Sequence, residues 1–323
     1  MIDPIIFTID LGSFTFSLHW YGVLVMLGVV VGAYIAGLEI QRRGGNPEHL
    51  WDGLLWALPA GILGARLWYC ATDILGGNSR YLDNPLRIIN ITEGGLHFYG
   101  GILFAGVVFY FYTRYHKIDL RLIVDAVGPS LLIGQAVARP ANFINQELYG
   151  QPTDLPWGIS ISQHSRISPW NDMLQFPEAT TRFHPTFAYE IILNLFAAAL
   201  LIWIAHRFTK KIRPGSIFLG WLIFEGIGRV ILENFRPDQP RFAGTDLSYS
   251  SVVAAAMAFV GIIVLLIKYE IIRLPGISSG PKTYKIQNAD GERAISPELN
   301  GDEVPGDDLS EHKPDPFENN QED

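Results

Sequence analysis

The sequence predicts an all-α, polytopic integral membrane protein with seven transmembrane helices, and two observations carry this prediction. Of the 323 residues, 49% are hydrophobic and only 17% are charged, whereas a soluble domain carries about a quarter charged residues. A helix that crosses a bilayer needs roughly 20 mostly apolar residues. The chain contains seven stretches of this kind, at residues 17–38, 51–71, 96–114, 122–144, 185–206, 216–235 and 249–268.

Glycine recurs in the first three predicted helices, for example at Gly28 and Gly32 and at Gly100, Gly101 and Gly106. Small residues let two helix backbones approach closely inside a bilayer. We therefore expect these helices to pack against their neighbours through glycine-bearing faces. The sequence shows no internal repeat, which disfavours a transporter built from inverted repeats.

Lys and Arg residues in the connections set the orientation of the helices, because cytoplasmic connections carry more of them. One side of the membrane collects 11 of these residues and the opposite side collects 6. We therefore predict an N-terminus outside the cell and a C-terminus in the cytoplasm. An odd number of spans agrees with chain ends on opposite sides.

Residues 1–274 form the predicted membrane domain, and residues 275–323 form an acidic cytoplasmic tail. The tail holds 12 acidic and 4 basic residues, so the formal charge of -8 belongs to it and says nothing about the substrate. Its composition, rich in Pro, Gly, Asp and Glu, predicts disorder. The longest connection, about residues 146–184, contains Trp157 and Trp170. We expect it to form a small ordered extracytoplasmic cap between spans four and five.

Cys70 is the only cysteine, which excludes an intrachain disulfide and a metal site built from several cysteines. The first ten residues lack the basic region of a cleaved signal peptide. We therefore expect the first span to act as its own insertion signal. The sequence predicts neither a metal site nor a cofactor.

Polar residues gather at the outer end of the fourth predicted helix. Steps of four, three and four residues place four of them on one helical stripe: Gln135, Arg139, Asn142 and Gln146. Pro140 disfavours helical geometry at the preceding residue, so the helix should kink or end at Arg139. An Arg inside a span costs about 2.5–3.5 kcal/mol and usually marks function. The alternatives are an Arg that snorkels to the headgroups and a polar clamp between helices.

The sixth predicted helix carries a second stripe, in which Glu225, Arg229, Glu233 and Arg236 recur at steps of four, four and three. Glu225 and Glu233 can each pair with Arg229 and fix the direction of its guanidinium. The alternative is a ladder of ion pairs that only packs helices. Two arginines from separate helices can converge on one anion, and Arg suits phosphate because its planar fork donates two parallel hydrogen bonds. Glu190, in the fifth span, also needs a partner.

Other residues at the outer ends of spans are weaker candidates. His19 and Tyr21 open the first span, where aromatic residues usually form only an interfacial belt. His97 and Tyr99 lie between two pairs of glycines at the start of the third span, which makes them catalytic candidates. Arg66, near the outer end of the second span, can snorkel to the headgroups.

Several segments, in this order, resemble the prolipoprotein diacylglyceryl transferase family of bacteria. The longest match is the pattern Arg139-x-x-Asn142-Phe143-x-Asn145-x-Glu147-x-x-Gly150. The others are His19–Gly22, Gly64–Leu67, Gly94–Gly101, His184-Pro185 with Tyr189-Glu190, and Gly228–Asp238. Together they cover about residues 15–268. The chain departs from the family at Ala138 and Ala141, where Gly is usual, and at Tyr99, where His is frequent.

The resemblance implies an enzyme of the bacterial cytoplasmic membrane with its active site on the extracytoplasmic side. Such an enzyme transfers the diacylglyceryl group from phosphatidylglycerol to the lipobox cysteine thiol of prolipoprotein signal peptides, forms a thioether and releases glycerol phosphate. The resemblance also implies that Arg139 binds the lipid phosphate and that Arg229 is essential. The partners are then the two substrates and the lipid bilayer, with no nucleic acid.

The site residues follow as hypotheses from this resemblance and from the two stripes. The predicted substrate-binding residues are Arg139, Asn142, Asn145, Glu147, Gly150, Tyr21, His19, Glu233 and Arg236. Arg139 and Arg229 are expected to stabilise the charge that builds on the departing glycerol phosphate. A base must accept the thiol proton, because only the thiolate attacks well. Tyr99, His97 and His19 all remain open for that role.

Two other functions are alternatives to the transferase. A transporter or flippase for an anionic lipid or solute would bind phosphate with the same arginines and make no bond. An intramembrane serine protease is disfavoured, because the sequence has no G-x-S-x-G pattern and Ser130 lies toward the inner half of its span.

Overall fold

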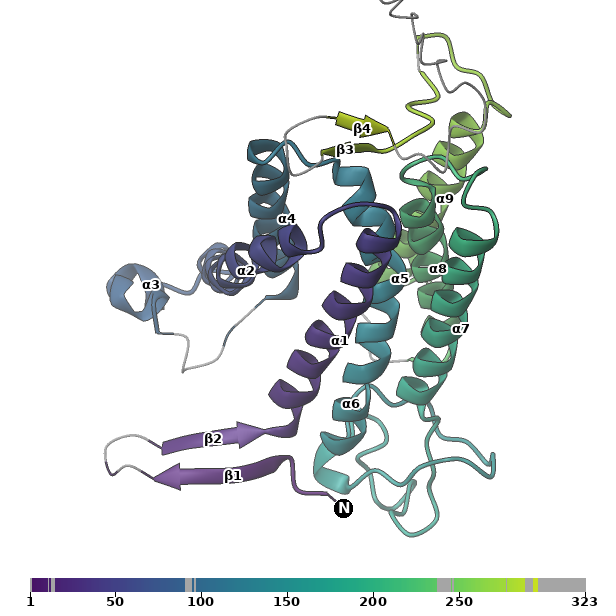
Figure 1. The fold of residues 1–323 in the computed structure, drawn as a ribbon. Helices are drawn as coiled ribbons and strands as arrows, with labels where there is room; N and C mark the ends of the chain where they lie inside the picture. The colour runs from purple at the N-terminus through teal and green to yellow at the C-terminus, as the bar shows by residue number, and fades with distance from the viewer. Residues whose placement is uncertain are drawn as a thin grey trace, which may run out of the picture.

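The fold is helical, with two small antiparallel sheets at its margins (Figure 1). The computed structural model describes residues 2–10, 12, 15–90, 95, 97–236, 245, 247–276, 278–287 and 293–295. The long helices are α1 (Trp20–Arg42), α2 (Glu48–Leu75), α4 (Phe98–Tyr115), α5 (Leu120–Ala138), α7 (Thr186–Arg207), α8 (Ser216–Glu233) and α9 (Tyr249–Lys268). The short ones are α3 (Arg80–Asp83), η1 (Pro85–Ile88), α6 (Pro140–Ile144) and η3 (Gln163–Ser165). Each of the seven predicted stretches therefore coincides with a long helix.

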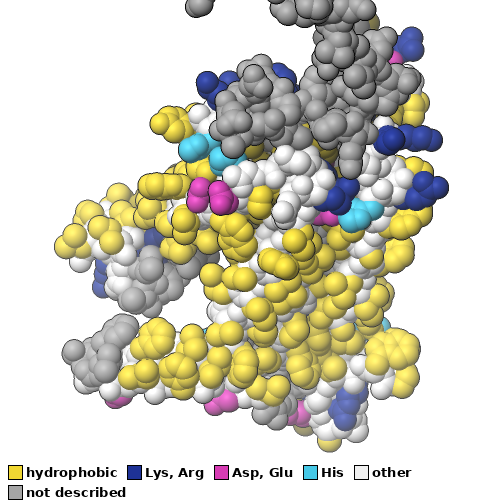
Figure 2. Space-filling model, in the orientation of Figure 1, with side chains coloured by type: hydrophobic (Ala, Val, Ile, Leu, Met, Phe, Trp, Pro, Cys, Tyr) yellow, Lys and Arg dark blue, Asp and Glu magenta, His cyan; other side chains and the backbone are white. Residues whose placement is uncertain are grey.

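In the described part of the chain, five helical segments are long and apolar enough to cross a membrane: α1, α2, α5 continued by α6, α7 and α9. The two other long helices are each 18 residues in length. Helix α8 carries Glu225, Arg229 and Glu233, and α4 is rich in glycine and tyrosine. The multi-pass character is thus confirmed, while the full count of seven spans stays a prediction. Figure 2 shows a broad apolar surface with Lys and Arg gathered near its upper end.

Helix α5 lies at the centre of the bundle, where α1, α7 and α8 all pack against it, and α9 covers α8 (Figure 1). Its contact with α1 is backbone against backbone, since a methyl group on Gly28 would lie 2.4 Å from the carbonyl oxygen of Gly134. Helices α2 and α4 pair in the same way, because a methyl on Gly100 would lie 2.3 Å from the carbonyl oxygen of Gly64. The predicted packing role of glycine is confirmed at Gly28 and Gly100, whereas Gly106 has nothing within 4 Å.

The α2–α4 pair stands beside the bundle rather than inside it (Figure 1). The two parts share an apolar cluster at the end where α1 finishes and α5 begins. Its buried members are Ala36, Ile40, Leu50, Leu122, Ile123, Ala126 and Tyr284. Tyr284 brings in the C-terminal segment, which forms β3 (Lys285–Gln287) paired with β4 (Arg293–Ile295). The chain therefore has defined structure at 278–287 and 293–295, where the sequence predicted a disordered tail, and residues 288–292 and 296–323 lie outside the described residues.

Tyr284 is fixed by a buried carboxylate of α5. Its hydroxyl donates to Asp125 Oδ2 at 2.7 Å, and Asp125 also accepts from the backbone N–H groups of Gly215 and Phe218 at the start of α8. Burial, together with the negative charge of Asp125, raises the pKa of the Tyr284 hydroxyl. Asp125 is fully buried, and these three donors supply hydrogen bonds to its carboxylate. The same bonds connect the C-terminal segment to α5 and α8.

A β-hairpin that the sequence did not predict precedes α1. Strands β1 (Ile5–Asp10) and β2 (Thr15–His19) pair antiparallel, so the first helix begins three residues later than predicted. Phe7 faces Leu18 and Ile9 faces Phe16, and these pairs give the hairpin one apolar face that is exposed (Figure 2). The apolar run into α1 concealed this hairpin, because an unbroken apolar segment does not reveal where a strand gives way to a helix.

Candidate functional site

Arg139 lies at the break between α5 and α6. Helix α5 ends at Ala138, and Pro140 begins α6, because proline supplies no N–H but suits the first position of a new helix. The Arg139 N–H still donates to the carbonyl oxygen of Gln135 at 3.0 Å. The predicted interruption at Arg139 is therefore confirmed, and it leaves the guanidinium at the C-terminal end of the central helix.

The Arg139 guanidinium has two side-chain partners. Its Nη2 forms an ion pair with Glu190 Oε1 of α7, and its Nη1 donates to Asn142 Oδ1 at 3.3 Å. The Arg139 and Glu190 side chains are 23% and 14% exposed, so the pair is largely withdrawn from solvent. Glu190 thus has the partner that the sequence required, from a residue 51 positions away.

Asn142 continues this group to Glu147. Its amide Nδ2 donates to Glu147 Oε1 at 2.8 Å, and Asn145 Nδ2 reaches the same oxygen at 3.5 Å. The backbone N–H of Glu147 donates to the carbonyl oxygen of Asn142 at 2.9 Å. The flanking residues Gln146 and Leu148 both have φ of 54°, a strained left-handed conformation for residues other than glycine. The structure therefore brings Arg139, Asn142, Asn145 and Glu147 together, as the sequence pattern predicted.

The predicted four-residue stripe is wrong at Gln146, whereas Gln135 and Arg139 both face Glu225 of α8. Gln135 Oε1 accepts from Asn194 Nδ2 of α7 at 3.0 Å. Gln146 lies beyond the end of α6, and its Oε1 accepts from the Ser162 N–H at 2.7 Å and the Ser162 hydroxyl at 2.8 Å. The stripe assumed a helix that continued past residue 145. The left-handed turn instead directs Gln146 toward the cap.

Arg229 occupies the second group, on α8. Its Nε lies 3.3 Å from Glu233 Oε2, and Glu233 Oε1 accepts from the Ser250 hydroxyl of α9 at 2.8 Å. Of the two predicted partners of Arg229, Glu233 therefore forms the ion pair. Glu225 forms none with the described residues, but its carboxylate interacts electrostatically with both Arg139 and Arg229. Glu225 is thus the carboxylate that interacts with both arginines.

The candidate bases lie on other elements. His97 begins α4, and its N–H donates to the carbonyl oxygen of Ala65 at 2.9 Å. His19, at the end of β2, places Nδ1 3.1 Å from the carbonyl oxygen of Ser17, and Tyr21 is exposed in the first turn of α1. Tyr99 is in the first turn of α4, but its side chain lies outside the described residues. No described hydrogen bond joins His19 or His97 to the two arginine groups.

Arg66 does not snorkel, which corrects the interpretation from sequence. It is 2% exposed, and its guanidinium donates to the carbonyl oxygens of Ile88 (3.0 Å), Gly95 (3.2 Å) and Arg87 (2.6 Å). It also stacks near the rings of Tyr69 and Tyr81. Arg66 and its neighbour in sequence, Ala65, therefore anchor the chain that enters α4 at His97. Carbonyl acceptors leave no sequence pattern, so the sequence could not show this.

Gly150 lies at a tight junction between the cap, α7 and the end of α8. Its N–H donates to the carbonyl oxygen of His184 at 2.8 Å, and an added methyl would lie 2.7 Å from the carbonyl oxygen of Phe235. The adjoining Arg236 is buried. Burial lowers the pKa of the His184 imidazole, whose Nδ1 lies 3.0 Å from the Tyr189 hydroxyl. Both predicted substrate residues, Gly150 and Arg236, are thus close-packed here.

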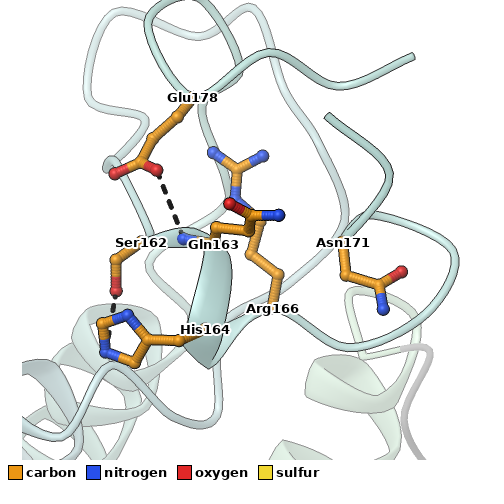
Figure 3. A pocket seen from close by; sticks show the side chains of 6 residues that line it. All are labelled: Ser162, Gln163, His164, Arg166, Asn171 and Glu178. Carbon is orange, nitrogen blue, oxygen red and sulfur yellow. Dashed lines mark hydrogen bonds between the residues drawn. The ribbon is translucent and has the colours of Figure 1, made fainter. Parts of the chain in front are cut away.

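The cap is folded around a buried cluster of Tyr149, Ile161, Trp170 and Phe183, as predicted. It also holds a polar pocket of about 650 Å³ that the sequence did not indicate (Figure 3). The pocket is lined by Ser162, Gln163, His164, Arg166, Asn171 and Glu178. The Ser162–Gln146 hydrogen bonds connect its wall to the turn that carries Glu147.

The fold and the site define a class: a multi-pass helical membrane protein whose central helix ends in a withdrawn group of arginines, carboxylates and amides. The family described as prolipoprotein diacylglyceryl transferase matches residues 4–267. The chain belongs to this family, which confirms the resemblance seen in the sequence.

Curated relatives agree with the family match over most of the chain. A protein of Chloroflexus aggregans is 34% identical over 271 residues, which are 81% of this chain and 87% of the relative. A protein of Bifidobacterium longum is 33% identical over 258 residues, 78% and 77% of the two chains. A third, of Leifsonia xyli, is 34% identical over 278 residues, 84% and 80% of the two chains. All three are named phosphatidylglycerol–prolipoprotein diacylglyceryl transferase.

Proposed function

We propose that this protein is a transferase that moves the diacylglyceryl group of phosphatidylglycerol to the lipobox cysteine thiol of prolipoprotein signal peptides. A carbon–sulfur bond forms at the glyceryl carbon as its bond to the phosphate oxygen breaks, and glycerol phosphate leaves. The family membership supports this function, and one structural observation carries it: the Arg139 group, with its amides and carboxylate, at the end of the central helix.

Arg139 is proposed to bind the lipid phosphate. A phosphate that approaches this guanidinium competes with Glu190 for the same donors, and its two oxygens match the guanidinium fork. Asn142, Asn145 and Glu147 then orient the headgroup glycerol. Arg229 stabilises the charge that develops on the departing glycerol phosphate, in the manner of an oxyanion site.

The substrate brings the nucleophile. Cys70, the only cysteine of the chain, is 3% exposed and lies within α2, away from both arginine groups. The thiol of the peptide substrate must lose its proton, and Tyr99, His97 and His19 are the candidate bases suggested by the sequence. Gly150, Tyr21, Glu233 and Arg236 complete the proposed substrate site. Both reacting groups come from the substrates, so the reaction uses no cofactor.

The proposed arrangement in the membrane has seven spans, with α4 and α8 as the two short ones. An 18-residue helix rises about 27 Å, close to the hydrocarbon thickness of roughly 30 Å. The excess of Lys and Arg on one side supports a cytoplasmic C-terminus in the bacterial plasma membrane. The Arg139 group, the cap and the hairpin then lie at the extracytoplasmic face, where both substrates arrive.

A reconstituted assay tests the function. The purified chain in vesicles receives labelled phosphatidylglycerol and a synthetic signal peptide with its lipobox cysteine. A labelled thioether peptide supports the transferase, whereas label that crosses the bilayer unchanged supports the alternative, a transporter or flippase. Arg139→Ala and Arg229→Ala should each abolish the thioether while the protein still inserts. Normal transfer by both variants would contradict the role of the arginines.

A further inference from the structure

Glu225 is a carboxylate that forms no ion pair with the described residues. It lies in α8 one turn before Arg229 and is half-buried. Its Oε2 atom is shielded from solvent and has no hydrogen-bond partner among the described residues. A carboxylate inside a membrane helix is costly, and such residues usually line a pathway or a reaction site. A buried oxygen without a donor adds to that cost.

The other buried carboxylates of the chain show what a structural role looks like here. Asp125 accepts hydrogen bonds from Tyr284, Gly215 and Phe218. Glu39 is paired with Arg42, Arg43 and His206. Each of these carboxylates holds separate segments together through several donors. Glu225 does not share this pattern.

The surroundings of Glu225 are charged on two of the three helices that pack against α8. Gln135 of α5 is a hydrogen-bond partner of the carboxylate, Arg139 lies at the end of the same helix, and α7 presents Glu190. On α8 itself, Arg229 lies one turn away. The third neighbour, α9, contributes the apolar Ala254 and Ala258 at the adjacent Gly226.

Glu225 lies outside both ion pairs of this region, and outside the hydrogen bonds that Asn142 and Asn145 donate to Glu147. Arg139 is already paired with Glu190, and Arg229 is paired with Glu233. Glu225 therefore adds a further negative charge beside the two ion pairs. Glu225 lies one turn from Arg229 and interacts electrostatically with Arg139, the two arginines that are proposed to hold the phosphate next to the reacting carbon.

We propose that Glu225 is the proton acceptor for the substrate thiol, an inference that rests on the function proposed above. The thiol S–H bond breaks, and its proton moves to a Glu225 oxygen. The thiolate then forms the carbon–sulfur bond at the glyceryl carbon, while the carbon–oxygen bond breaks and its electron pair stays on the phosphate. Glu225 afterwards passes the proton to the departing glycerol phosphate, so the carboxylate is restored and no other reactant is needed.

A change of nucleophile tests this role. The full chain in phosphatidylglycerol vesicles receives two signal peptides, one with its lipobox cysteine and one with selenocysteine at that position. A selenol is already ionised at neutral pH and needs no base. Glu225→Gln should lower the rate with the thiol peptide by about 100-fold or more, the size of a general-base contribution. The same variant should transfer to the selenol peptide at nearly the wild-type rate.

Glu233→Gln is the matched control, because it removes a carboxylate from the same helix that orients Arg229. It should slow both peptides equally. Equal loss with both peptides in Glu225→Gln, or no loss with either, would overturn the role as proton acceptor. If Glu225→Gln fails to insert, Glu225→Asp decides: a larger loss with the thiol than with the selenol supports the role, and equal losses overturn it. Failure of the wild-type protein to form any thioether would instead refute the proposed function.

Discussion

Replacement of Arg66 by Lys should release the chain that enters α4. The guanidinium spans three carbonyl oxygens at once, those of Arg87, Ile88 and Gly95. A lysine ammonium is a single nitrogen on a longer flexible stem and cannot reproduce that fork. At least two of the three carbonyl groups should therefore lose their donor in a buried place.

The expected magnitude follows from these contacts. Hydrogen bonds to a charged group contribute about 1.5–3 kcal/mol each, so the loss of two gives about 3–6 kcal/mol. The contacts with the rings of Tyr69 and Tyr81 add about 0.5–1 kcal/mol each where they are weakened. The effect should be local to this segment. A loss of this size makes the equilibrium constant for local opening at least about 100-fold larger in the variant than in the wild type.

Hydrogen–deuterium exchange of the protein in detergent measures that opening. The amides of Ile89 and His97, which are bonded to Leu86 and Ala65, should exchange about 100-fold faster in Arg66→Lys. Arg166→Lys is the matched control, because Arg166 is equally buried and donates to the carbonyl oxygens of Ile161 and Phe176 in the cap. It should accelerate exchange in the cap alone. Unchanged exchange at Ile89 and His97 in Arg66→Lys would refute the anchoring role.

Three further predictions concern other regions. Cys70→Ala should form the thioether at a rate close to wild type, and an inactive but correctly folded variant would contradict a nucleophile supplied by the substrate. Tyr284→Phe should lower the free energy of unfolding by about 1–3 kcal/mol, because Asp125 loses one of its donors; an unchanged melting temperature in detergent would contradict this. The folded-state pKa of His184 is lowered from 6.5, so its contribution to stability is complete above pH 6.5 and is lost as the pH falls below that value. Fluorescence of Trp157, which donates to Tyr189 beside His184, should report loosening on acidification, and His184→Gln should remove this pH response.

The features that could be predicted from sequence are those set by short-range spacing. The seven apolar stretches each coincide with a helix. Helix α5 ends just before Pro140, because proline has no backbone N–H with which to continue the helix. Arg139, Asn142 and Glu147 contact one another because they lie on the short helix α6 and the turns that flank it. These contacts depend on neighbours in the chain, so periodicity and proline chemistry were sufficient.

The features that could not be predicted depend on distant partners or on backbone geometry. Gln146 appeared to extend a helical stripe, but a left-handed turn directs it to Ser162. Arg66 bonds to carbonyl oxygens more than 20 positions away, and every residue type carries a carbonyl. Glu225 and Glu233 were both predicted to pair with Arg229 by their spacing, and among the described residues Glu233 forms the ion pair. For Gln146 and Arg66 the residue type was informative, but the partner was not encoded locally.

The glycine contacts also constrain how the protein is made. Helix α1 pairs with α5 through Gly28 and Gly134, whereas α2 pairs with α4. The 77 residues between Arg42 and Leu120 must leave the ribosome before α1 can meet its partner, a wait of about 4–16 s at 5–20 residues per second. During that time the α2–α4 unit can close while the glycine face of α1 is covered only by lipid. Assembly in the membrane therefore follows an order different from that of synthesis, and α5, which carries Arg139, is the helix that joins the two parts.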